Sequence, residues 1–299
     1  MFLSLKEGLR GRYWSPDCQL GRPAVFGSRS MITILLIFVV GLAVGVLGSM
    51  LGIGGGVLLI PLLTALFGVE IRTAIGASII SVIATSAAAG AVYIGRGQTH
   101  SRLAMVLEIA TTLGALTGGF TAVLLSPNLL AGLFAAVLVY VVFSMSKIPK
   151  DEPEAVPTGL LDTSYYDPIT GKRVSYGVTH LPLGMGASFL AGNISGLLGI
   201  GGGIIKVPIM SLVMGMPLRA SIATSNFMIG ITAATSAIIY YQHGYINPSI
   251  AIPTALGVLV GARQGTRLGG RVRSNRLKQI FQIVLLVFAV QMFFKSVRG

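Results

Sequence analysis

Long apolar stretches separated by short polar segments run through most of the chain. They cover residues 31–68, 74–95, 103–125, 128–146, 182–216, 220–241, 247–262 and 279–294. Because about 20 apolar residues in a helix span a hydrocarbon core of about 30 Å, most of these stretches predict one membrane-spanning helix each. The pattern therefore predicts an all-α polytopic membrane protein.

The stretches 31–68 and 182–216 are too long for one straight crossing. A helix rises about 1.5 Å per residue, so a continuous helix over either stretch would far exceed the core. Their helix breakers are Gly52–Gly56 with Pro61, and Gly199–Gly203 with Pro208. Glycine and proline disfavour helix continuation. Each stretch is therefore predicted to form a broken Gly-rich helix or a hairpin that turns at its glycines.

A shift of 147 residues matches the chain to itself without gaps. The two Gly-rich runs coincide, and the matched pairs include Pro61 and Pro208, Gly68 and Gly215, Arg72 and Arg219, Ser78 and Ser225, and Tyr93 and Tyr240. Residues 51–97 share 15 identities in 47 positions with their counterparts. Glycines, prolines and arginines do not align this way by chance. The sequence therefore predicts two homologous repeats, at residues 31–146 and 181–299.

Loop charges predict how the two repeats are oriented, because cytoplasmic loops are enriched in Lys and Arg. Loop 96–102 carries two arginines, whereas its counterpart 243–248 carries no Lys or Arg. Loop 126–128 carries none, whereas its counterpart 263–278 carries six basic residues. Parallel repeats would place each basic loop on the same side of the membrane as its uncharged counterpart. Inverted repeats place the two basic loops together on the cytoplasmic side, and they are therefore favoured. Each repeat then has three spans and a Gly-rich hairpin, and the linker 147–180 is cytoplasmic.

Two polar segments lie outside the repeats. Residues 147–180 contain four prolines and five acidic residues, which is typical of a linker outside the membrane. Residues 1–30 contain five Lys or Arg and form a polar basic arm. This arm is either a cytoplasmic extension or the product of an upstream start codon, with Met31 as the true first residue. We favour the second interpretation, because inverted repeats would place the basic arm outside the cell.

Composition excludes several other classes of protein. Apolar residues make up 53% of the chain and charged residues 10%, whereas soluble domains carry about 25% charged residues. The net charge of +13 is interpreted as loop charge that orients the protein, and nucleic-acid binding is not expected, because no basic segment carries interleaved aromatic residues. Cys18 has no partner for a disulfide or a Cys-type metal site. We expect no metal, no cofactor and no enzymatic activity.

At its paired Gly-rich motifs the chain resembles the sulfite exporter TauE/SafE family of membrane transporters. The motifs are GxxxGxLLGIGGG-like stretches, here Gly45–Gly56 and Gly192–Gly203, each followed by a proline. The resemblance covers about residues 31–297. It implies transport of sulfite, sulfonates or other small organic anions, without enzymatic activity or a required cofactor.

Candidate substrate contacts gather around the Gly-rich turns. Broken helices in a membrane expose backbone groups, and helix N-termini at such breaks suit anions. The candidates are Gly54, Gly55, Gly56, Gly201, Gly202, Gly203, Lys206, Ser78, Ser225, Asn226, Arg72 and Arg219. Structural alternatives stay open: close helix packing for the glycines, hydrogen bonds between helices for the small polar residues, and interfacial anchoring for the arginines.

Two charged residues inside apolar stretches have uncharged counterparts in the other repeat. Lys206 follows Gly203 by three residues, and its counterpart is Leu59. A lysine buried in a membrane is usually functional, although its side chain can also reach an interface. Glu108, whose counterpart is Ala255, could accept a proton or pair with the nearby Arg102 at an interface. The histidines His100, His180 and His243 fall in or near loops and are expected to be solvated.

Together these features predict a carrier in the cytoplasmic membrane, a bacterial inner membrane. It would move a small anion, such as a sulfur oxyanion or organosulfonate, by alternating access around a site at the bilayer midplane. An anion channel, or a receptor or enzyme subunit that transports nothing, are the alternatives. The expected partners are the anion and the lipid bilayer, and a homo-oligomer is left open.

Overall fold

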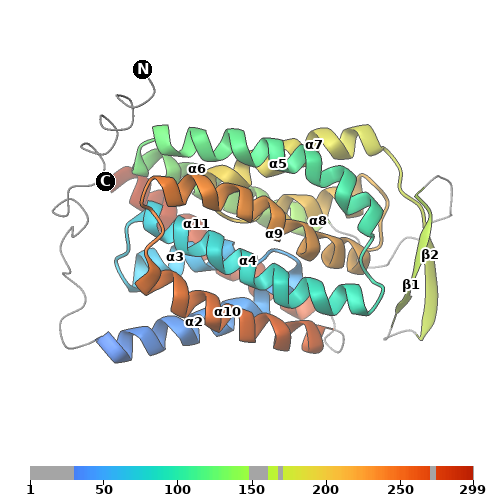
Figure 1. Ribbon diagram of the computed structural model, residues 1–299, viewed down its shortest axis with the longest axis horizontal. Helices are drawn as coiled ribbons and strands as arrows, with labels where there is room; N and C mark the ends of the chain where they lie inside the picture. The colour runs from blue at the N-terminus through green and yellow to red at the C-terminus, as the bar shows by residue number, and fades with distance from the viewer. Residues whose placement is uncertain (1–29, 148–160, 168–170, 270–273, 299) are drawn as a thin grey trace, which may run out of the picture. The chain divides into compact units, whose positions relative to one another are not determined.

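The computed structural model describes residues 30–147, 161–167, 171–269 and 274–298 (Figure 1). It divides into two units, Met1–Leu36 and Ile37–Gly299. The first unit contributes only the start of one helix to the described residues. All contacts below lie within the second unit. The basic arm predicted at residues 1–30 falls almost wholly outside the described residues.

Helices make up nearly all of the described chain. In order they are α2 (Ser30–Leu51), α3 (Gly56–Leu66), α4 (Ile71–Gly95), α5 (Ser101–Leu124), α6 (Pro127–Lys147), α7 (Leu181–Leu198), α8 (Gly203–Leu212), α9 (Leu218–Gln242), α10 (Pro248–Gly269) and α11 (Ser274–Arg298). Two short strands, β1 (Thr163–Asp167) and β2 (Lys172–Tyr176), lie between α6 and α7. Six of the helices are long and apolar enough to cross a membrane. The prediction of an all-α polytopic membrane protein is confirmed.

Both long apolar stretches break at their Gly-rich runs, as predicted. Helix α2 ends just before Gly52 and α7 ends just before Gly199. Within the turns, Gly54, Gly55, Gly201 and Gly202 have φ between 71° and 79°, a conformation that other residues rarely adopt. The chain folds back at each turn, so that Gly55 lies against Val44 of α2 and Gly202 against Ala191 of α7.

Close helix crossings depend on glycine and recur at the 147-residue shift. In the α5–α7 crossing, a Cβ on Gly118 would lie 2.0 Å from the carbonyl oxygen of Asn193. In the α2–α10 crossing, a Cβ on Gly265 would lie 2.4 Å from the carbonyl oxygen of Val46. Gly265 and Val46 are the counterparts of Gly118 and Asn193. Equivalent helices therefore meet through equivalent residues, with one helix taken from each predicted repeat.

Helices α4 and α9 occupy the middle of the bundle, with α5 and α7 on one side and α2 and α10 on the other (Figure 1). Near the end of α4, Ala89 and Tyr93 cluster with Ala223, near the start of α9. Near the start of α4, Gly76 lies against Tyr245, just beyond the end of α9. The two helices are therefore antiparallel, which is the orientation that inverted repeats require.

The connecting segments gather in two groups. At one end of the unit, Arg96 donates a hydrogen bond to the carbonyl of Thr266 near the end of α10 (3.0 Å), and His100 bonds the carbonyl of Leu161 in the linker (2.8 Å). At the other end, Arg72 joins the α5–α6 loop to the α9–α10 loop through Leu125 and Tyr245. The basic loops thus lie together with the linker. The side of the membrane on which each end lies stays a prediction.

The linker contains a β-hairpin that no pattern in the sequence predicts. Strands β1 and β2 pair antiparallel, with Thr163 opposite Tyr176. The hairpin buries Tyr165 and Tyr176 against the start of α5 and the Met residues that follow α8. It also covers His100, which is only 5% exposed. The expectation that His100 is solvated is therefore wrong, because the linker folds over it.

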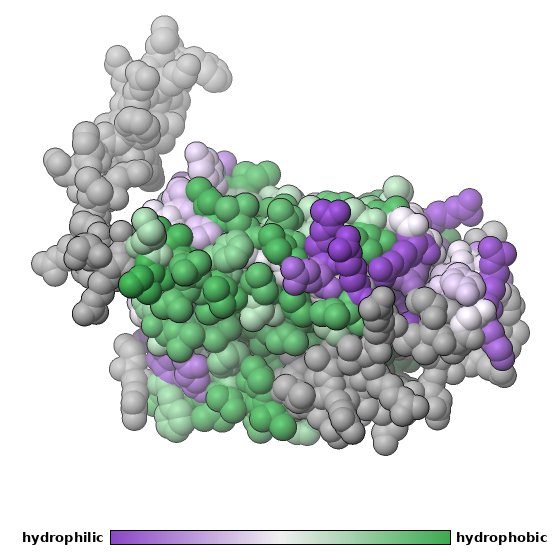
Figure 2. Space-filling view, turned by 90° about the horizontal axis from the view of Figure 1, so that it is seen from below, coloured by the Kyte–Doolittle hydropathy of each residue, from purple (hydrophilic) through white to green (hydrophobic). Residues whose placement is uncertain are grey.

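Apolar side chains cover much of the outside of the helices. On α5, Met105, Ile109, Leu113, Leu116 and Phe120 are exposed at helical spacing and form one stripe. Figure 2 shows one face of the molecule largely covered by apolar residues, with hydrophilic residues gathered mainly toward one end. Such a surface suits the hydrocarbon of a bilayer and would be unfavourable in water.

Candidate functional site

The two Gly-rich turns meet in the interior of the bundle. The hydroxyl of Ser78 on α4 donates to the carbonyl of Gly199 (2.8 Å), and the hydroxyl of Ser225 on α9 donates to the carbonyl of Gly52 (2.8 Å). These two bonds are counterparts at the 147-residue shift. Each central helix therefore holds the turn that belongs to the other predicted repeat.

The turns are closely packed in this conformation. A Cβ on Gly203 would lie 2.3 Å from the carbonyl oxygen of Gly52, and one on Gly56 would lie 2.9 Å from that of Gly199. From the sequence, these glycines are expected to face a solute. Here they face the opposite turn and the side chains of α4 and α9. Contact between these glycines and an anion stays a prediction, and it requires the turns to separate.

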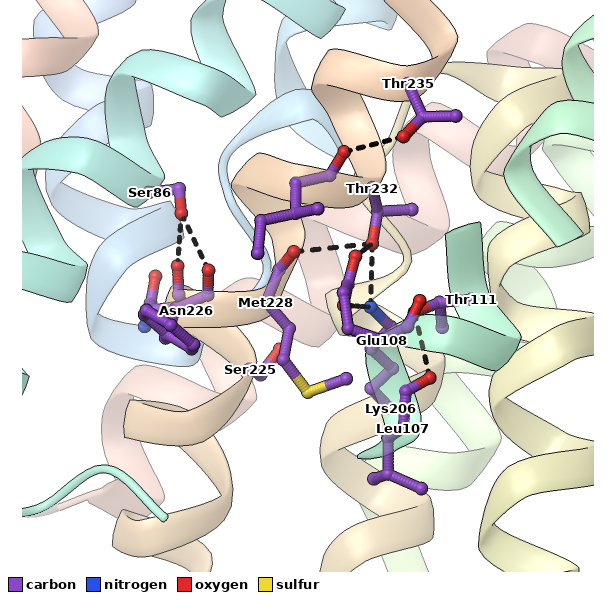
Figure 3. Close-up of polar contacts among 12 residues, drawn as sticks. Ser86, Leu107, Glu108, Thr111, Lys206, Ser225, Asn226, Met228, Thr232 and Thr235 are labelled. Atoms are coloured by element: carbon purple, nitrogen blue, oxygen red, sulfur yellow. Dashed lines mark hydrogen bonds and ion pairs between the residues drawn. The ribbon is translucent and has the colours of Figure 1, made fainter. Parts of the chain in front are cut away.

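A buried ion pair lies one helical turn away from this junction. Lys206 in the first turn of α8 places its Nζ 3.3 Å from Oε2 of Glu108 on α5. The hydroxyl of Thr232 on α9 bridges the two charges (Figure 3). The side chains of Lys206 and Glu108 are 1% and 7% exposed. Three helices thus contribute one polar side chain each to a buried cluster, which we call the ionic triad.

Hydrogen bonds connect the members of the ionic triad in a ring. Lys206 Nζ donates to Thr232 Oγ1 (2.9 Å) and to Glu108 Oε2 (3.3 Å). Thr232 Oγ1 in turn donates to Glu108 Oε1 (2.6 Å). The third N–H of the ammonium has no acceptor within hydrogen-bond distance in the part of the chain that the structure describes. The triad is neutral overall, and the third N–H of Lys206 can donate a hydrogen bond to a further ligand.

The ionic triad corrects two interpretations of the sequence. Glu108 was expected near an interface beside Arg102, but it is buried and pairs with Lys206, 98 residues along the chain. Interfacial snorkelling was the alternative for Lys206, and its 1% exposure excludes it in this conformation. A bilayer interior makes an unpaired charge costly, which explains why the two charges meet.

The triad has no charged equivalent in the other half of the unit. The counterparts of its charged residues are Leu59 and Ala255. Thr85, the counterpart of Thr232, donates instead to the carbonyl of Gly54 (3.1 Å). Backbone contacts recur between the halves, whereas the charges do not. The ion pair is therefore not needed to hold two such halves together.

The two candidate arginines differ in their surroundings from Lys206. Arg72 donates to the carbonyl of Leu125 (2.7 Å) and the hydroxyl of Tyr245 (3.0 Å), and its guanidinium lies 5.3 Å from the centre of the Tyr245 ring. These contacts tie the start of α4 to two loops at the end of the bundle. They favour the anchoring interpretation of Arg72. Arg219, its counterpart, also has an interaction partner.

Asn226 is fully buried on α9 beside the turns. Its Nδ2 donates to the carbonyls of Ser49 (3.2 Å) and Ile222 (3.0 Å). Its Oδ1 has no hydrogen-bond partner among the described residues. An amide oxygen accepts hydrogen bonds but repels anions, so the contacts of Asn226 favour a role in holding α2 against α9.

Lys206 stands out in the sequence, but no local pattern there assigns its partners Glu108 and Thr232 to it. Thr232 was missed altogether, because a threonine in an apolar helix carries no distinctive signal. A usable signal did exist for the pair: Lys206 and Glu108 are both charged where the other repeat is uncharged. Two unmatched charges of opposite sign in membrane helices predict a pair, since each offsets the burial cost of the other.

The helices and the buried ion pair define a multi-pass membrane protein with a polar site inside its helical bundle. Comparison with known families gives the class, because the profile described as "Sulfite exporter TauE/SafE" matches residues 37–292. The chain therefore belongs to this family, and the resemblance identified from the Gly-rich motifs is confirmed. It is a membrane transporter.

Relatives occur in distant organisms, and two of them match this chain over nearly their whole length. "Probable membrane transporter protein YunE" of Bacillus subtilis is 26% identical, over 89% of this chain and 99% of its own. "Probable membrane transporter protein MJ0441" of Methanocaldococcus jannaschii is 24% identical, over 88% and 96%. "Sulfite exporter TauE/SafE family protein 5" of Arabidopsis thaliana is 41% identical over 21% of this chain and 14% of its own. No solved structure matches the chain significantly.

Proposed function

We propose that this chain is a carrier for small anions and that Lys206 binds the anion. The candidate substrates are sulfite, organosulfonates and related sulfur-containing or organic anions. The family name supports an anionic sulfur compound, and the ionic triad supplies a cation to receive it. Movement would occur by alternating access, with the two halves of the bundle rocking about the junction of the Gly-rich turns.

The single observation that carries this proposal is the buried ammonium of Lys206. Ionisable residues inside a membrane protein are costly and mark substrate or ion pathways. Replacing a buried ion pair by apolar residues is often neutral or stabilising by about 1–4 kcal/mol, so stability alone does not explain the pair. Leu59 occupies the matching position in the other half and is fully buried without any charge. Function is therefore the better explanation of Lys206.

Two features of the fold support alternating access. The matched crossings of α5 with α7 and α10 with α2 provide two similar halves that can exchange roles. The Gly-rich hairpins reach the centre from opposite ends and touch there through backbone atoms. Small residues at such a contact allow sliding with little side-chain rearrangement. The first turns of α3 and α8 also direct backbone N–H groups toward this centre, which suits an anion.

The proposal is tested by flux in proteoliposomes containing the full chain. Radiolabelled sulfite is offered outside, and unlabelled sulfite, sulfate, thiosulfate, methanesulfonate or acetate is loaded inside. A carrier gives saturable uptake that the correct internal anion accelerates by counterflow. A channel gives uptake without counterflow, and absence of flux for every anion in the panel would refute anion transport.

A matched variant separates transport from folding. The double substitution Lys206→Leu with Glu108→Ala copies the side chains at the counterpart positions, Leu59 and Ala255. It removes both charges together, so no buried charge is left unpaired. We expect this variant to insert and to remain stable while losing anion flux. Unchanged flux in the double variant would remove Lys206 from the substrate site.

A further inference from the structure

We propose that Glu108 is the proton acceptor of the carrier and that its protonation frees Lys206 to bind the anion. This inference rests on the proposed function, because it concerns the same buried lysine. It identifies the proton as the coupling ion, which neither the family's name nor the relatives' names specify. The argument comes from the arrangement of the ionic triad and from charge balance inside a bilayer.

Glu108 and an anionic substrate would compete for the same ammonium. Oε2 of Glu108 accepts from Lys206 and Oε1 accepts from Thr232. The carboxylate therefore occupies the hydroxyl of Thr232 and one N–H of the ammonium, and a single N–H of Lys206 remains for an incoming anion. An anion added to the intact pair would face the negative charge of Glu108 at close range in a medium of low dielectric constant. Binding therefore requires the carboxylate to lose its charge or move away.

Proton uptake by Glu108 removes this obstacle without adding net charge to the loaded site. A proton bound to a carboxylate oxygen leaves a neutral acid, and Lys206 keeps its positive charge. A monoanion then pairs with the ammonium, and the hydroxyl of Thr232 is free to donate to it. The empty triad holds one negative and one positive charge, and the loaded triad holds the anion and the ammonium. Both states are neutral, so both can be enclosed in the bilayer interior.

Few other charged groups lie on the neighbouring helices where they could neutralise Lys206. Helix α7 has no titratable residue in its sequence, and on α8 Lys206 is the single one. Helix α9 carries Arg219 near its start and Tyr240 and Tyr241 near its end. Each is at least eight residues from Thr232, which is about 12 Å along the helix axis. None of these three can neutralise Lys206 at the triad.

The remaining neighbours of Glu108 lie toward the end of the bundle where the linker packs. On α5, Arg102 precedes Glu108 by six residues and is exposed. The linker tyrosines Tyr165 and Tyr176 cluster with Leu103 and Leu107, which precede Glu108 by five residues and one residue. Burial raises the pKa of the Tyr176 hydroxyl, so this group stays neutral at physiological pH. Glu108 is therefore the group on which protonation changes the charge of the triad.

A consequence is that one proton moves with each monovalent anion. The empty carrier can return because its ion pair re-forms, and the loaded carrier can cross because anion and ammonium are paired. A carrier that has bound the anion but no proton cannot make the conformational change, since it would enclose an excess negative charge in the bilayer. The direction of net transport then follows the combined gradients of the proton and the anion. Where the empty carrier holds the ion pair, anion affinity should rise as pH falls, by up to about tenfold per pH unit for one linked proton.

The substitution Glu108→Gln tests the coupling directly. Glutamine keeps the size of the side chain but cannot become an anion, so Lys206 is available at every pH. Anion-for-anion exchange should persist within about threefold of wild type, because the loaded state is still neutral. Net uptake should fall at least about tenfold, because the empty carrier would have to enclose an unpaired ammonium. Exchange should also lose its pH dependence.

Controls make the outcomes separable. Glu70→Gln alters an exposed glutamate at the start of α4 and should leave net uptake and exchange unchanged. If wild type shows no exchange and no net flux of any panel anion, the proposed function itself fails. If wild type transports and Glu108→Gln keeps net uptake with the wild-type pH dependence, only the coupling proposal is overturned.

A second measurement needs no variant. Purified wild-type protein in weakly buffered detergent solution is mixed with methanesulfonate near neutral pH, and a pH indicator follows proton uptake. Methanesulfonate stays a monoanion at this pH, so a proton that disappears from solution is bound by the protein. We expect about one proton taken up for each anion bound, as the linkage of one carboxyl group requires. Anion binding without proton uptake would overturn the assignment of Glu108.

Discussion

The substitution Gly118→Ala tests the close crossing of α5 and α7 on which the bundle depends. The added Cβ would lie 2.0 Å from the carbonyl oxygen of Asn193, whereas ordinary contact begins at 3.4 Å. The shortfall of about 1.4 Å cannot be relieved by rotating a side chain, because both groups belong to backbones. The two helices must therefore move apart along much of their length.

The expected loss of stability follows from two opposing effects. Overpacking a well-filled interior typically costs about 1–3 kcal/mol and occasionally more. Alanine regains about 1 kcal/mol over glycine in helix propensity. Because the clash is with backbone, we take the upper end of the packing cost, which leaves a net loss of about 2 kcal/mol. For a chain of this size that corresponds to a fall of about 4–8 °C in the midpoint of thermal unfolding.

The assay is thermal unfolding of purified protein in detergent, followed by the loss of the monodisperse peak. Gly95→Ala is the matched control, because Gly95 lies at the end of α4 with nothing within 4 Å of its added Cβ. We expect no loss in this control. Gly265→Ala, at the equivalent place in the α2–α10 crossing, should resemble Gly118→Ala. An unfolding midpoint for Gly118→Ala at or above that of wild type would refute the packing described.

Three further predictions address orientation, the ion pair and the linker. Ser101→Cys and Ser249→Cys, each in a Cys18→Ser background, should label from opposite sides of the membrane, and labelling from one side would contradict inverted repeats. Lys206→Leu alone should lower the free energy of unfolding by about 3 kcal/mol in a denaturation series. Adding Glu108→Ala to this variant should restore the free energy of unfolding. Additive losses would show that the two residues do not interact. Tyr176→Ala should loosen the β-hairpin by about 3 kcal/mol and speed tryptic cleavage at Lys172 and Arg173, and an unchanged cleavage rate would contradict the packing of Tyr176.

The helix breaks could be predicted from sequence because they depend on local chemistry. A run such as Gly52–Gly56 inside an apolar stretch cannot continue a helix comfortably, whatever surrounds it. Length adds a second constraint, because the bilayer thickness limits a straight helix. Both constraints are visible in one sequence, and α2 and α7 end where they indicate.

The ionic triad could be predicted only in part because it depends on how distant helices cross. Lys206 stood out as a charge in an apolar stretch, but its partner lies on α5 and its bridging hydroxyl on α9. No local pattern specifies that these three helices converge. The same reason explains His100, whose burial depends on a linker hairpin that begins some 60 residues later.

The β-hairpin itself was missed for a different reason. Its strands are five residues each and lie in a segment rich in proline and acidic residues, which is typical of a linker. An isolated two-stranded hairpin is marginally stable in water. Here it persists because Tyr165 and Tyr176 are buried against the helices. Tertiary packing, and not strand propensity, decides this element.

Anion binding by purified protein tests the assignment of Lys206 most directly. Wild type and the double variant Lys206→Leu with Glu108→Ala are heated in detergent with and without sulfite or methanesulfonate. At about 100 times its Kd, a ligand that binds only the folded state adds about 2.7 kcal/mol, a rise of about 5–10 °C in the unfolding midpoint. We predict this rise for wild type and none for the double variant. An equal rise in both proteins would contradict an anion site at Lys206.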